Sequence, residues 1–597
     1  MSVFVEQARE LPVYAECDLL VVGGGAAGSS AAIAAARAGL KNIILMERYG
    51  YMGGDVTGGY VVMIPAMSWY NKSFVRGLQE EWMTRLEKIP GALLTPSLDE
   101  IGSEDKFKVN RWRSINGALC RPRFEVGKGR HLVRAPQYEP NELKIILDEM
   151  VQEHSDAIRL LYHTWGVRPI VEDNKMAGVI FESKEGRQAI KAKFVIDATG
   201  DGDIFSQTGA PFYSLADGKA RSAGTALVWR AGGVDWEKWS EWIDARPDLK
   251  DDWRRQLTRI AGFRCIPYNT NNPFMCWFNN NHNPRDCTKI EDLTITEIET
   301  RLSIHRVLDY MKDICPIAWR DAYLYDIAPQ LGARCSRRLD GEYMMTPNDF
   351  AFAKQHDDVI AWHSTICQIN DGGPVEIPYR AILPKKIENL LCPGRHMSAD
   401  DIAIDWLNLI PQCTGTGQAA GVAAAVALRD GVGAHDVDVR KVQDILAGEQ
   451  DVPLPRNAHT DISYTQLCEE KQYGLYTEFA LKAQAEGEGV YDYRKDEAAN
   501  QGSRQRRRGP GMGQGMGQRG PGMGQGMGQR GPGMGPGMGQ RGPGMGPGMG
   551  QRGPGMGQGM GQRGPGMGQG MGQRGPGMGQ GMGYGMGYGG GDDIGEH

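Results

Sequence analysis

Short apolar runs that end in glycine-rich turns mark the beginning of the chain. Residues 19–22 are an apolar run with the length of a buried parallel strand, and a glycine cluster follows at once. Residues 29–38 are almost all small and predict a helix that ends at Gly39. A second apolar run, 43–46, leads into Glu47. The pattern predicts a strand–turn–helix–strand unit of a parallel sheet.

The turn inside this unit has the spacing of a dinucleotide-binding site. Gly23 permits a tight turn, Gly25 lets the backbone approach a pyrophosphate, and Gly28 lets the helix pack closely on the strand. The first helical N–H groups, those of Ala26 and Ala27 among them, would face the phosphates. Glu47 would accept hydrogen bonds from the adenosine ribose. A glycine turn that binds nothing is the alternative, and the ordered succession of elements disfavours it.

Three further segments favour FAD over NAD. Residues 48–59 form a glycine-rich loop that suits the ribityl and isoalloxazine parts of a longer cofactor, and residues 193–203 predict a buried strand that ends in a small-residue turn. Residues 389–395 predict another strand, and residues 411–421 would open an alanine-rich helix over 422–428. The N–H groups at the start of this helix would face the flavin N1–C2=O edge. Close packing for reasons of fold alone is the alternative.

The hydrophobic pattern of the remaining segments predicts the other elements of a two-domain protein. Residues 140–153 predict an amphipathic helix, and short strands between 158 and 195 predict a small antiparallel sheet. The segment from Asp203 to Asn389 is too long for a crossover and would form a second domain over the flavin. It contains a predicted helix over 294–312, which a capping box from Thr294 to Glu297 would open.

The expected fold is α/β, with a Rossmann-type FAD-binding domain of three layers (ββα), an inserted α+β substrate domain and a disordered tail. The expected boundaries are 12–215 and 376–450 for the FAD-binding domain, 216–375 for the substrate or cap domain, 451–500 for a helical extension and 501–597 for the tail.

The tail repeats an eleven-residue unit, RGPGMGQGMGQ, from Arg508 onward. Glycine at alternate positions excludes collagen, and the lack of β-branched residues predicts disorder. An inert spacer or tether to a protein partner, self-association or nucleic-acid binding through the arginines, and Cu(I) binding through the methionines all stay open.

Composition sets limits on the rest. The net charge of −6 is mild, and eleven scattered cysteines without a CxxC pair exclude an iron–sulfur cluster or zinc ribbon, so no metal is expected. No apolar run of membrane-spanning length occurs, and the N-terminus lacks a signal-peptide pattern. A cytoplasmic location without membrane contact is expected, and homo-oligomerisation stays open.

Five ordered blocks carry a family resemblance over residues 11–430. They are VVGGGAAG at 21–28, ER-x-G-x-x-GG-x-x-T at 47–57, VIDATGDGD at 195–203, APQLGARCSRRLDGEY at 328–343, and ENLLCPGRHMSA at 388–399 with TGTGQAAGVAAA at 414–425. The sequence resembles the bacterial FAD-dependent oxidoreductases of the glutathione-reductase-like class, which are related to the fumarate reductase flavoproteins. The resemblance implies non-covalent FAD.

By matching motif, the resemblance assigns cofactor contacts along the whole blocks. The residues implied are Gly23, Gly25, Ala26, Ala27, Gly28, Glu47, Arg48, Gly54, Thr57, Thr199, Gly200, Asp203, Gly394, Arg395, Gly417 and Gln418. Residues 407–411 lack an arginine that many relatives carry, and His396 replaces a small or thiol residue, so no substrate is carried over.

The catalytic candidates come from the inserted segment and its borders. Arg334, with Arg337 and Arg338 nearby, would clamp a carboxylate, or else pair with neighbouring acids or the pyrophosphate. His282 and His396 are candidates for proton transfer because histidine titrates near neutral pH. His131 lies in a basic run, 121–134, that a solvated hairpin would explain equally well. A structural role is the competing interpretation for each histidine.

The predicted function is an FAD-dependent oxidoreductase that transfers hydride between flavin N5 and a small carboxylate-bearing substrate. The absence of a second GxGxxG argues against a disulfide-reductase type of NAD(P)H site, so the electron partner is left unidentified. An FAD-dependent monooxygenase is the alternative within flavoenzymes. A flavin-domain scaffold whose tail drives assembly, or binds a partner or nucleic acid, is the alternative from another class.

Overall fold

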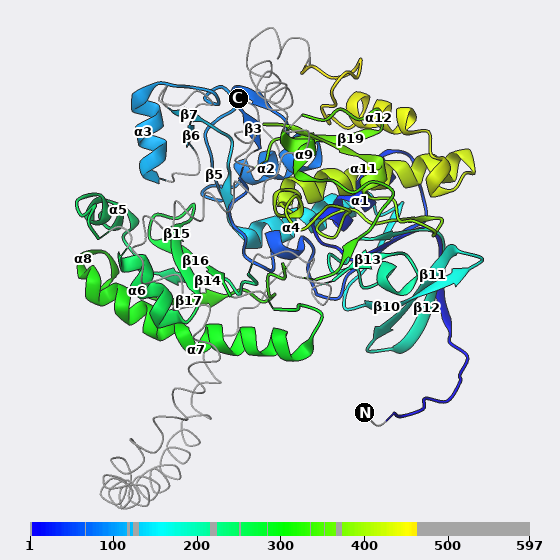
Figure 1. The fold of residues 1–597 in the computed structure, drawn as a ribbon, viewed down its shortest axis with the longest axis horizontal. Coiled ribbons are helices and arrows are strands. Elements are labelled where there is room, and N and C mark those ends of the chain that lie inside the picture. The colour runs from blue at the N-terminus through cyan, green and yellow to red at the C-terminus, as the bar shows by residue number, and fades with distance from the viewer. Residues whose placement is uncertain are drawn as a thin grey trace, which may run out of the picture. The chain divides into compact units, whose positions relative to one another are not determined.

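A mixed sheet of seven strands organises the first of two compact units, residues 1–491, in this computed structural model (Figure 1). The structure describes residues 3–65, 67–115, 120–122, 130–214, 224–249, 252–282, 285–334, 336–351, 353–365 and 373–462. The second unit, 492–597, lies outside the described residues, so the disorder predicted for the tail stays a prediction.

The sheet has the order β10-β11-β12-β1-β2-β9, and β21 also pairs with β12. Strands β21, β12, β1, β2 and β9 run parallel, as the apolar runs predict. Their bounds, with the two antiparallel strands, are β1 (Val13–Val22), β2 (Ile43–Met46), β9 (Ile158–Leu161), β10 (Trp165–Glu172), β11 (Lys175–Ser183), β12 (Gly186–Asp197) and β21 (Leu390–Leu391).

Strand β12 joins the parallel and antiparallel parts. Its first half pairs antiparallel with β11, and its second half pairs parallel with both β1 and β21. The strands predicted between 158 and 195 are present, but they form no separate small sheet: β10 and β11 extend the main sheet through β12, and β9 joins its other edge beside β2. Turns at 173–174 and 184–185 connect β10, β11 and β12.

Two helices pack together beside this sheet because both present small residues at their contact (Figure 1). They are α1 (Ala26–Arg37) and α11 (Ile410–Asp430). A Cβ on Gly417 would overlap the backbone of Ala27, and a Cβ on Gly421 would overlap that of Ala31. The equal spacing of these two contacts means that the helices run parallel. Helices α2 (Leu78–Glu87), α4 (Pro140–Gln152) and α12 (Val439–Gly448) pack around them.

A second, four-stranded sheet lies between Asp203 and Asn389, with the order β15-β16-β14-β17. Its strands and helices are β14 (Trp229–Gly232), β15 (Arg264–Asn269), β16 (Met275–Asn281), β17 (Tyr323–Ile327), α5 (Trp236–Asp244), α6 (Asp252–Ala261), α7 (Ile290–Ile314) and α8 (Pro316–Trp319). The helices and strands share a core rich in tryptophan, in which Trp229 and Trp319 are fully buried. This region has its own core, as the expectation of an inserted domain requires, and the exact boundaries stay a proposal.

The described part of the chain also contains short two-stranded ribbons and three further helices. They are β3 (Ser68–Trp69) with β4 (Lys72–Ser73), β5 (Leu93–Leu94) with β8 (Gln137–Tyr138), β6 (Cys120–Pro122) with β7 (Arg130–Leu132), β13 (Phe212–Tyr213) with β18 (Arg338–Leu339), β19 (Val359–His363) with β20 (Val375–Pro378), and helices α3 (Lys106–Ile115), α9 (Pro347–Ala351) and α10 (Ile404–Leu407).

Buried polar groups fix the second sheet to the first part of the chain. Arg230 on β14 is almost fully buried and forms ion pairs with Asp326 at 2.6 Å and with Glu139, the residue that caps α4, at 2.7 Å. The side-chain amides of Gln137 and Asn269 also exchange two hydrogen bonds. Because both contacts are buried, the second sheet is held in a defined position over the first part.

Several predicted boundaries differ from the structure. Helix α7 begins at Ile290, so Thr294 lies inside it and the predicted capping box is wrong. Helix α11 begins at Ile410, so the glycine-rich stretch at 414–421 lies within the helix and does not precede it. Residues 451–462 contain no helix, contrary to the predicted extension, and 463–500 lie outside the described residues. The predicted helix at 140–153 is confirmed, with Glu139 as its cap.

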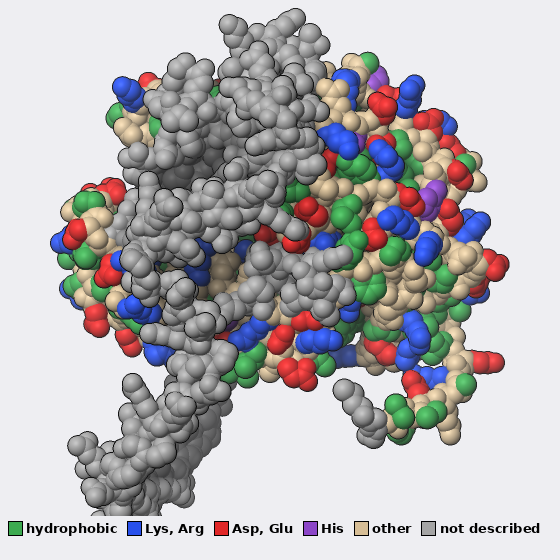
Figure 2. All heavy atoms as spheres, in the orientation of Figure 1, with side chains coloured by type: hydrophobic (Ala, Val, Ile, Leu, Met, Phe, Trp, Pro, Cys, Tyr) green, Lys and Arg blue, Asp and Glu red, His purple; other side chains and the backbone are tan. Residues whose placement is uncertain are grey.

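Charged side chains of both signs are interspersed over the described surface on the face drawn in Figure 2. None of the helices in the described part of the chain has both the length and the apolarity needed to cross a bilayer.

We expect Gly421→Ala to lower the free energy of unfolding by about 1–3 kcal/mol, because the new methyl group must push α1 and α11 apart. Chemical denaturation of the purified protein measures this change. Gly448→Ala is the control, since its Cβ would meet only the side chain of His459, 3.3 Å away. Equal stability of the two variants would contradict the close helix contact.

Candidate functional site

The carboxyl ends of the parallel strands meet at one edge of the sheet. Val22 pairs with Met46 on one side and with Asp197 on the other, so β1, β2 and β12 end level with one another. The loops that follow these strands line a cavity that opens to solvent. Ligands of open α/β sheets bind at such an edge.

The first loop presents bare backbone to the cavity. Gly23 has a φ of +96°, and a Cβ on Gly28 would overlap the carbonyl oxygen of Gly23. Gly25, in contrast, lines the cavity, and a Cβ there would meet no atom within 4 Å. Gly23 therefore shapes the turn, and Gly28 lets the helix pack against it, while the space in front of Gly25 is left for a ligand.

Helix α1 begins at this loop without a capping side chain or an acidic residue in its first turn. Gly25 occupies the N-cap position, and Ala26 and Ala27 line the cavity with it. Their N–H groups have no helical carbonyl to bind, and the helix dipole adds partial positive charge. The arrangement suits a phosphate group.

Glu47 lies at the end of β2, where the carboxylate is almost fully buried. Its two oxygens accept hydrogen bonds from the backbone N–H of Gly24, at 2.7 Å, and of Tyr49, at 2.9 Å. Burial raises the pKa of the Glu47 carboxyl, and these two bonds oppose the effect. Each carboxylate oxygen keeps further lone pairs, so the group is able to accept bonds from ribose hydroxyls as well.

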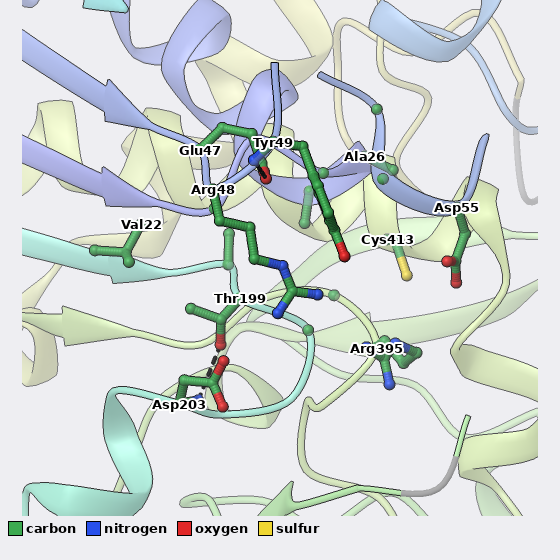
Figure 3. A pocket seen from close by; sticks show the side chains of 18 of the residues that line it. Val22, Ala26, Glu47, Arg48, Tyr49, Asp55, Thr199, Asp203, Arg395 and Cys413 are labelled. Atoms are coloured by element: carbon green, nitrogen blue, oxygen red, sulfur yellow. Dashed lines mark hydrogen bonds between the residues drawn. The ribbon is translucent and has the colours of Figure 1, made fainter. Parts of the chain in front are cut away.

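The turn after β12 forms the floor of the same side of the cavity. The buried Asp197 carboxylate accepts hydrogen bonds from the backbone N–H groups of Thr199, Ile204 and Phe205 and thereby fixes the turn. The hydroxyl of Thr199 accepts a bond from the N–H of Asp203 at 3.0 Å. Figure 3 shows Glu47, Arg48, Thr199 and Asp203 toward one side of the cavity.

Asp55, Arg395 and Cys413 lie toward the other side of the cavity (Figure 3). Arg395 forms an ion pair with Asp201 at 2.9 Å. Burial would raise the pKa of Asp201, but Arg395 holds it below its usual range. Burial also raises the pKa of Asp55, and here the arginines only reduce the effect.

The N-terminus of α11 opens into the same end of the cavity. Asn408, Ile410 and Cys413 line it. Since α1 and α11 run parallel, and Gly417 lies opposite Ala27, α11 starts six residues before α1, about 9 Å further along. The helix start therefore faces the cavity as predicted, but it does so through residues 410–413.

Four predicted cofactor contacts lie outside the lining of the cavity. Gly28 and Gly417 serve helix packing, as described above. The hydroxyl of Thr57 donates to the carbonyl of Met52. The amide of Gln418 binds the N–H of Leu78 and the side chain of Gln450. The other predicted contacts line the cavity: Gly23, Gly25, Ala26, Ala27, Glu47, Arg48, Gly54, Thr199, Gly200, Asp203, Gly394 and Arg395.

His396 is fully buried behind the turn that follows β12. Its Nδ1 accepts a hydrogen bond from the N–H of Gly202 at 3.1 Å, and its Nε2 lies 3.0 Å from the carbonyl oxygen of Asp197. Burial lowers the pKa of His396. Backbone groups engage both ring nitrogens, so the structure places this histidine as a brace for the turn and outside the cavity lining.

The other predicted catalytic residues lie in or near the second sheet. His282 is buried against Phe263 and hydrogen-bonds Thr300 at 2.7 Å, and burial lowers its pKa to about 4. It does not line the cavity. Arg334 also lies outside the cavity lining; it contacts Asn281 at 3.4 Å, and its charge opposes the rise that burial causes in the pKa of Asp55.

The basic run at 121–134 is a hairpin, β6 with β7, but it is not a solvated one where it is described. His131 stacks on Tyr70 at 4.4 Å, and Arg134 forms a buried ion pair with Glu80. Residues 123–129 lie outside the described residues.

The two arginines that follow Arg334 in the sequence have partners of their own. Arg337 forms an ion pair with Asp203 at 2.9 Å, and Arg338 is buried beside Tyr213.

Sequence reasoning missed Asp55 and Gln330. Asp55 lies in the short helical turn Gly54–Val56, and Gln330 comes from the family block at 328–343. The side-chain amide of Gln330 lies 3.5 Å from the Asp55 carboxylate. Asp55 lies inside the family motif at 47–57 and Gln330 inside the block at 328–343. A polar side chain within glycine-rich or apolar surroundings is the sequence signal that could have identified each of them.

These observations fit an extended dinucleotide such as FAD. The open space at Gly25 and the uncapped α1 would hold the diphosphate, Glu47 would hold the adenosine ribose, and the α11 start with Gly394 and Arg395 would face the flavin. The offset of about 9 Å between the two helix starts, measured along the helix axes, suits a cofactor that extends beyond its diphosphate.

Comparison with known proteins agrees with this geometry. A family model described as FAD dependent oxidoreductase matches residues 18–446. No curated protein matches the sequence. Similar solved structures include a geranylgeranyl bacteriochlorophyll reductase-like protein from Thermoplasma acidophilum (15% identity, 78% of this chain and 88% of that chain covered, TM-score 0.36). They also include a flavin-dependent brominase (12%, 81% and 92%, 0.37) and L-proline dehydrogenase from P. horikoshii (12%, 72% and 96%, 0.34).

We expect Gly25→Val to abolish FAD retention while the apoprotein stays folded, because the new side chain fills ligand space and meets no protein atom at its Cβ. Flavin absorbance after gel filtration measures retention, and circular dichroism of the apoprotein checks folding. Gly28→Ala should instead destabilise the apoprotein, since its Cβ overlaps the Gly23 backbone. Stoichiometric FAD in Gly25→Val would contradict this assignment.

We expect Glu47→Ala to weaken FAD binding about 10- to 100-fold, because a hydrogen bond to a charged group contributes about 1.5–3 kcal/mol. Titration of the apoprotein with FAD measures the Kd. In the wild type, FAD binding should also weaken as the pH falls through the raised pKa of Glu47, since the protonated carboxyl accepts fewer bonds. Glu182→Ala on β11, which is far more exposed, is the control. An unchanged Kd in Glu47→Ala would refute the ribose contact.

Proposed function

The chain belongs to the FAD dependent oxidoreductase family, and we propose that it transfers hydride between flavin N5 and a small organic substrate that carries a carboxylate. FAD is the cofactor of this enzyme. The feature that carries the proposal is the pair of arginines that act electrostatically on Asp55, namely Arg395 in the cavity lining and Arg334. The substrate class, the direction of hydride transfer and the roles below belong to the proposal.

The charges at this end favour an anionic ligand. Asp201 balances Arg395, but the carboxyl with which Arg334 interacts is Asp55, whose pKa burial raises. A guanidinium presents a planar fork of donors that matches a carboxylate, which favours a substrate acid at this end of the cavity.

The protein residues divide the work along the cavity. The α1 start and Glu47 would hold the nucleotide half, and the positive end of α11 would favour negative charge on the flavin half. When bound, FAD supplies a hydride acceptor or donor at N5. Arg334 and Arg395 orient the substrate carboxylate, and Asp55 is the titratable group on the substrate side that is placed to hold or release a proton.

His282 and His396 have a smaller part in this proposal than the sequence suggested. Both are buried and hydrogen-bonded away from the cavity lining, and burial lowers the pKa of each. We assign them positioning roles, His396 on the β12 turn and His282 on α7. Arg334 keeps its predicted role as the carboxylate clamp.

The other expectations remain predictions. The electron partner is an unidentified donor or acceptor, and the location is expected to be cytoplasmic. The repeat tail is expected to act as a tether or to self-associate. An FAD-dependent monooxygenase remains the alternative, because the nucleotide-binding half would be the same for both reactions.

We expect small carboxylic acids, such as α-amino or α-hydroxy acids, to reduce the bound flavin in the absence of oxygen, and the corresponding amides to be inactive. Arg334→Met should raise the acid concentration for half-maximal reduction about 10- to 100-fold, because a charged hydrogen bond is lost, and leave FAD binding unchanged. Stopped-flow flavin absorbance measures the reduction.

Arg320→Met is the control, since Arg320 is exposed and does not line the cavity. Flavin reduction by NADPH alone, followed by oxygen-dependent substrate hydroxylation, would contradict the proposal and favour the monooxygenase. Equal reduction by acids and amides would exclude the carboxylate clamp.

A further inference from the structure

Four polar side chains line the end of the cavity that the proposed function assigns to the substrate. They are Asp55, Gln330, Asn408 and Arg395, and Figure 3 shows Asp55 and Arg395 toward the same side. Contacts within the protein engage some of their polar atoms. The polar atoms that remain are the ones available to a ligand, and they determine which groups a substrate must bring.

The carboxylate of Asp55 accepts one long hydrogen bond within the described chain. Its Oδ1 lies 3.5 Å from the side-chain nitrogen of Gln330, and its Oδ2 has no hydrogen-bond partner among the described residues. Arg395, whose ion pair is with Asp201, acts on Asp55 only from a longer distance. A partly buried carboxylate in this situation is stabilised when a ligand donates a hydrogen bond to it.

Two neighbouring side-chain amides also have oxygens that accept no hydrogen bond within the described chain. Gln330 turns its nitrogen toward the Asp55 carboxylate, which would repel its oxygen, and Oε1 is left buried without a partner there. Asn408 donates from its nitrogen to the carbonyl of Ile404, which directs its oxygen away from that contact. The thiol of Cys413 in turn donates to the carbonyl of Asn408. Acceptors therefore predominate around Asp55.

The cofactor meets only part of this demand for donors. The isoalloxazine ring of oxidised FAD has one N–H, at N3, and otherwise presents oxygen and nitrogen acceptors. It is therefore able to satisfy at most one of the oxygens described above. The others require N–H or O–H groups from the substrate.

Arg395 supplies donors at the same end of the cavity. Its Nη1 contacts Asp201 at 2.9 Å and Ser336 at 3.3 Å, while its Nε and Nη2 make no hydrogen bond in the described chain. Nη2 lies beside Gly200, which lines the cavity, since a Cβ on that glycine would be 2.8 Å away. These donors suit the substrate carboxylate of the proposed function.

We propose that the substrate is an amine-bearing carboxylic acid whose ammonium group binds Asp55 and Asn408 while Arg395 binds its carboxylate. This inference rests on the proposed function, from which it takes the carboxylate and the hydride transfer. An ammonium group has three N–H donors and a positive charge, so it matches several acceptors around a carboxylate. Burial raises the pKa of Asp55, and the positive charge of the substrate opposes this effect.

The oxidation of such a substrate balances with the groups at this end of the cavity. The ammonium loses one proton to Asp55, and the carbon that carries the nitrogen gives a hydride to flavin N5. The carbon–nitrogen single bond becomes the double bond of an iminium, and Asp55 later releases the proton to solvent. An α-hydroxy acid, in contrast, brings a single donor and no positive charge, so it leaves the other acceptors without donors.

The test uses the full-length, FAD-loaded protein and pairs of acids that share a side chain. Each pair is an α-amino acid and its α-hydroxy analogue, namely alanine and lactate, phenylalanine and phenyllactate, and aspartate and malate, in both enantiomers. Stopped-flow absorbance without oxygen measures flavin reduction. We expect an amino acid to reduce the flavin and its hydroxy analogue to require about 10- to 100-fold more acid, because a hydrogen bond to a charged group is lost.

Asp55→Asn should raise the amino-acid concentration for half-maximal reduction about 10- to 100-fold. The inhibition constant of the acid without the amine, for example propionate against alanine, should stay unchanged, because Arg395 still binds its carboxylate. Asp430→Asn is the control and should behave as the wild type, since it only removes a charge from a surface ion pair with Lys441.

The outcomes separate this inference from the proposed function. Hydroxy acids that reduce the flavin as well as their amino analogues overturn the amine site and leave the carboxylate and the hydride transfer standing. Equal weakening of alanine and propionate in Asp55→Asn also overturns the amine site. Absence of reduction by every acid of the set overturns both proposals. If Asp55→Asn does not retain FAD, the comparison of the pairs in the wild type still decides.

Discussion

The parallel contact between α1 and α11 is the constraint on which the rest of the site depends. Because Gly417 and Gly421 carry no side chain, the backbones of the two helices come into direct contact. Their partners, Ala27 and Ala31, follow in the same order along α1, so the two helices run in the same direction. Two positive helix ends therefore open into one cavity, one level with the sheet edge and one further out. A cofactor that carries negative charge at both positions, in its diphosphate and in its reduced ring, matches this arrangement.

Much of this frame could be predicted from the sequence, because the local signals and the tertiary requirement agree there. The apolar runs before Gly23 and Glu47 form adjacent parallel strands, and the residues that follow them line the cavity. The start of α11 could not be predicted in the same way. A Thr-Gly-Thr-Gly stretch has low helix propensity, and only packing against α1 makes it helical.

The end of the cavity that we propose for the substrate was harder to predict for a different reason. A histidine in a sequence says nothing about which groups its ring nitrogens will meet, and both candidates satisfy theirs inside the protein. Asp55, in contrast, lies in a glycine-rich turn, and such a sequence suggests a role for the backbone and not for a side chain. Its significance comes from Arg334 and Gln330, which are almost three hundred residues away and approach only in the folded chain.

Gln330 also shows how the two halves of the chain share the cavity. Its backbone N–H binds the carbonyl of Gly58, and its side chain reaches Asp55, so the inserted region touches the nucleotide-binding half at the outer end of the pocket. Of the residues that we propose for the substrate end, Arg334 belongs to the inserted region, whereas Asp55 and Arg395 belong to the nucleotide-binding half, so both stretches of polypeptide would shape that end. Exchange of the inserted region alone would therefore leave part of the substrate end unaltered, for evolution and for protein engineers alike.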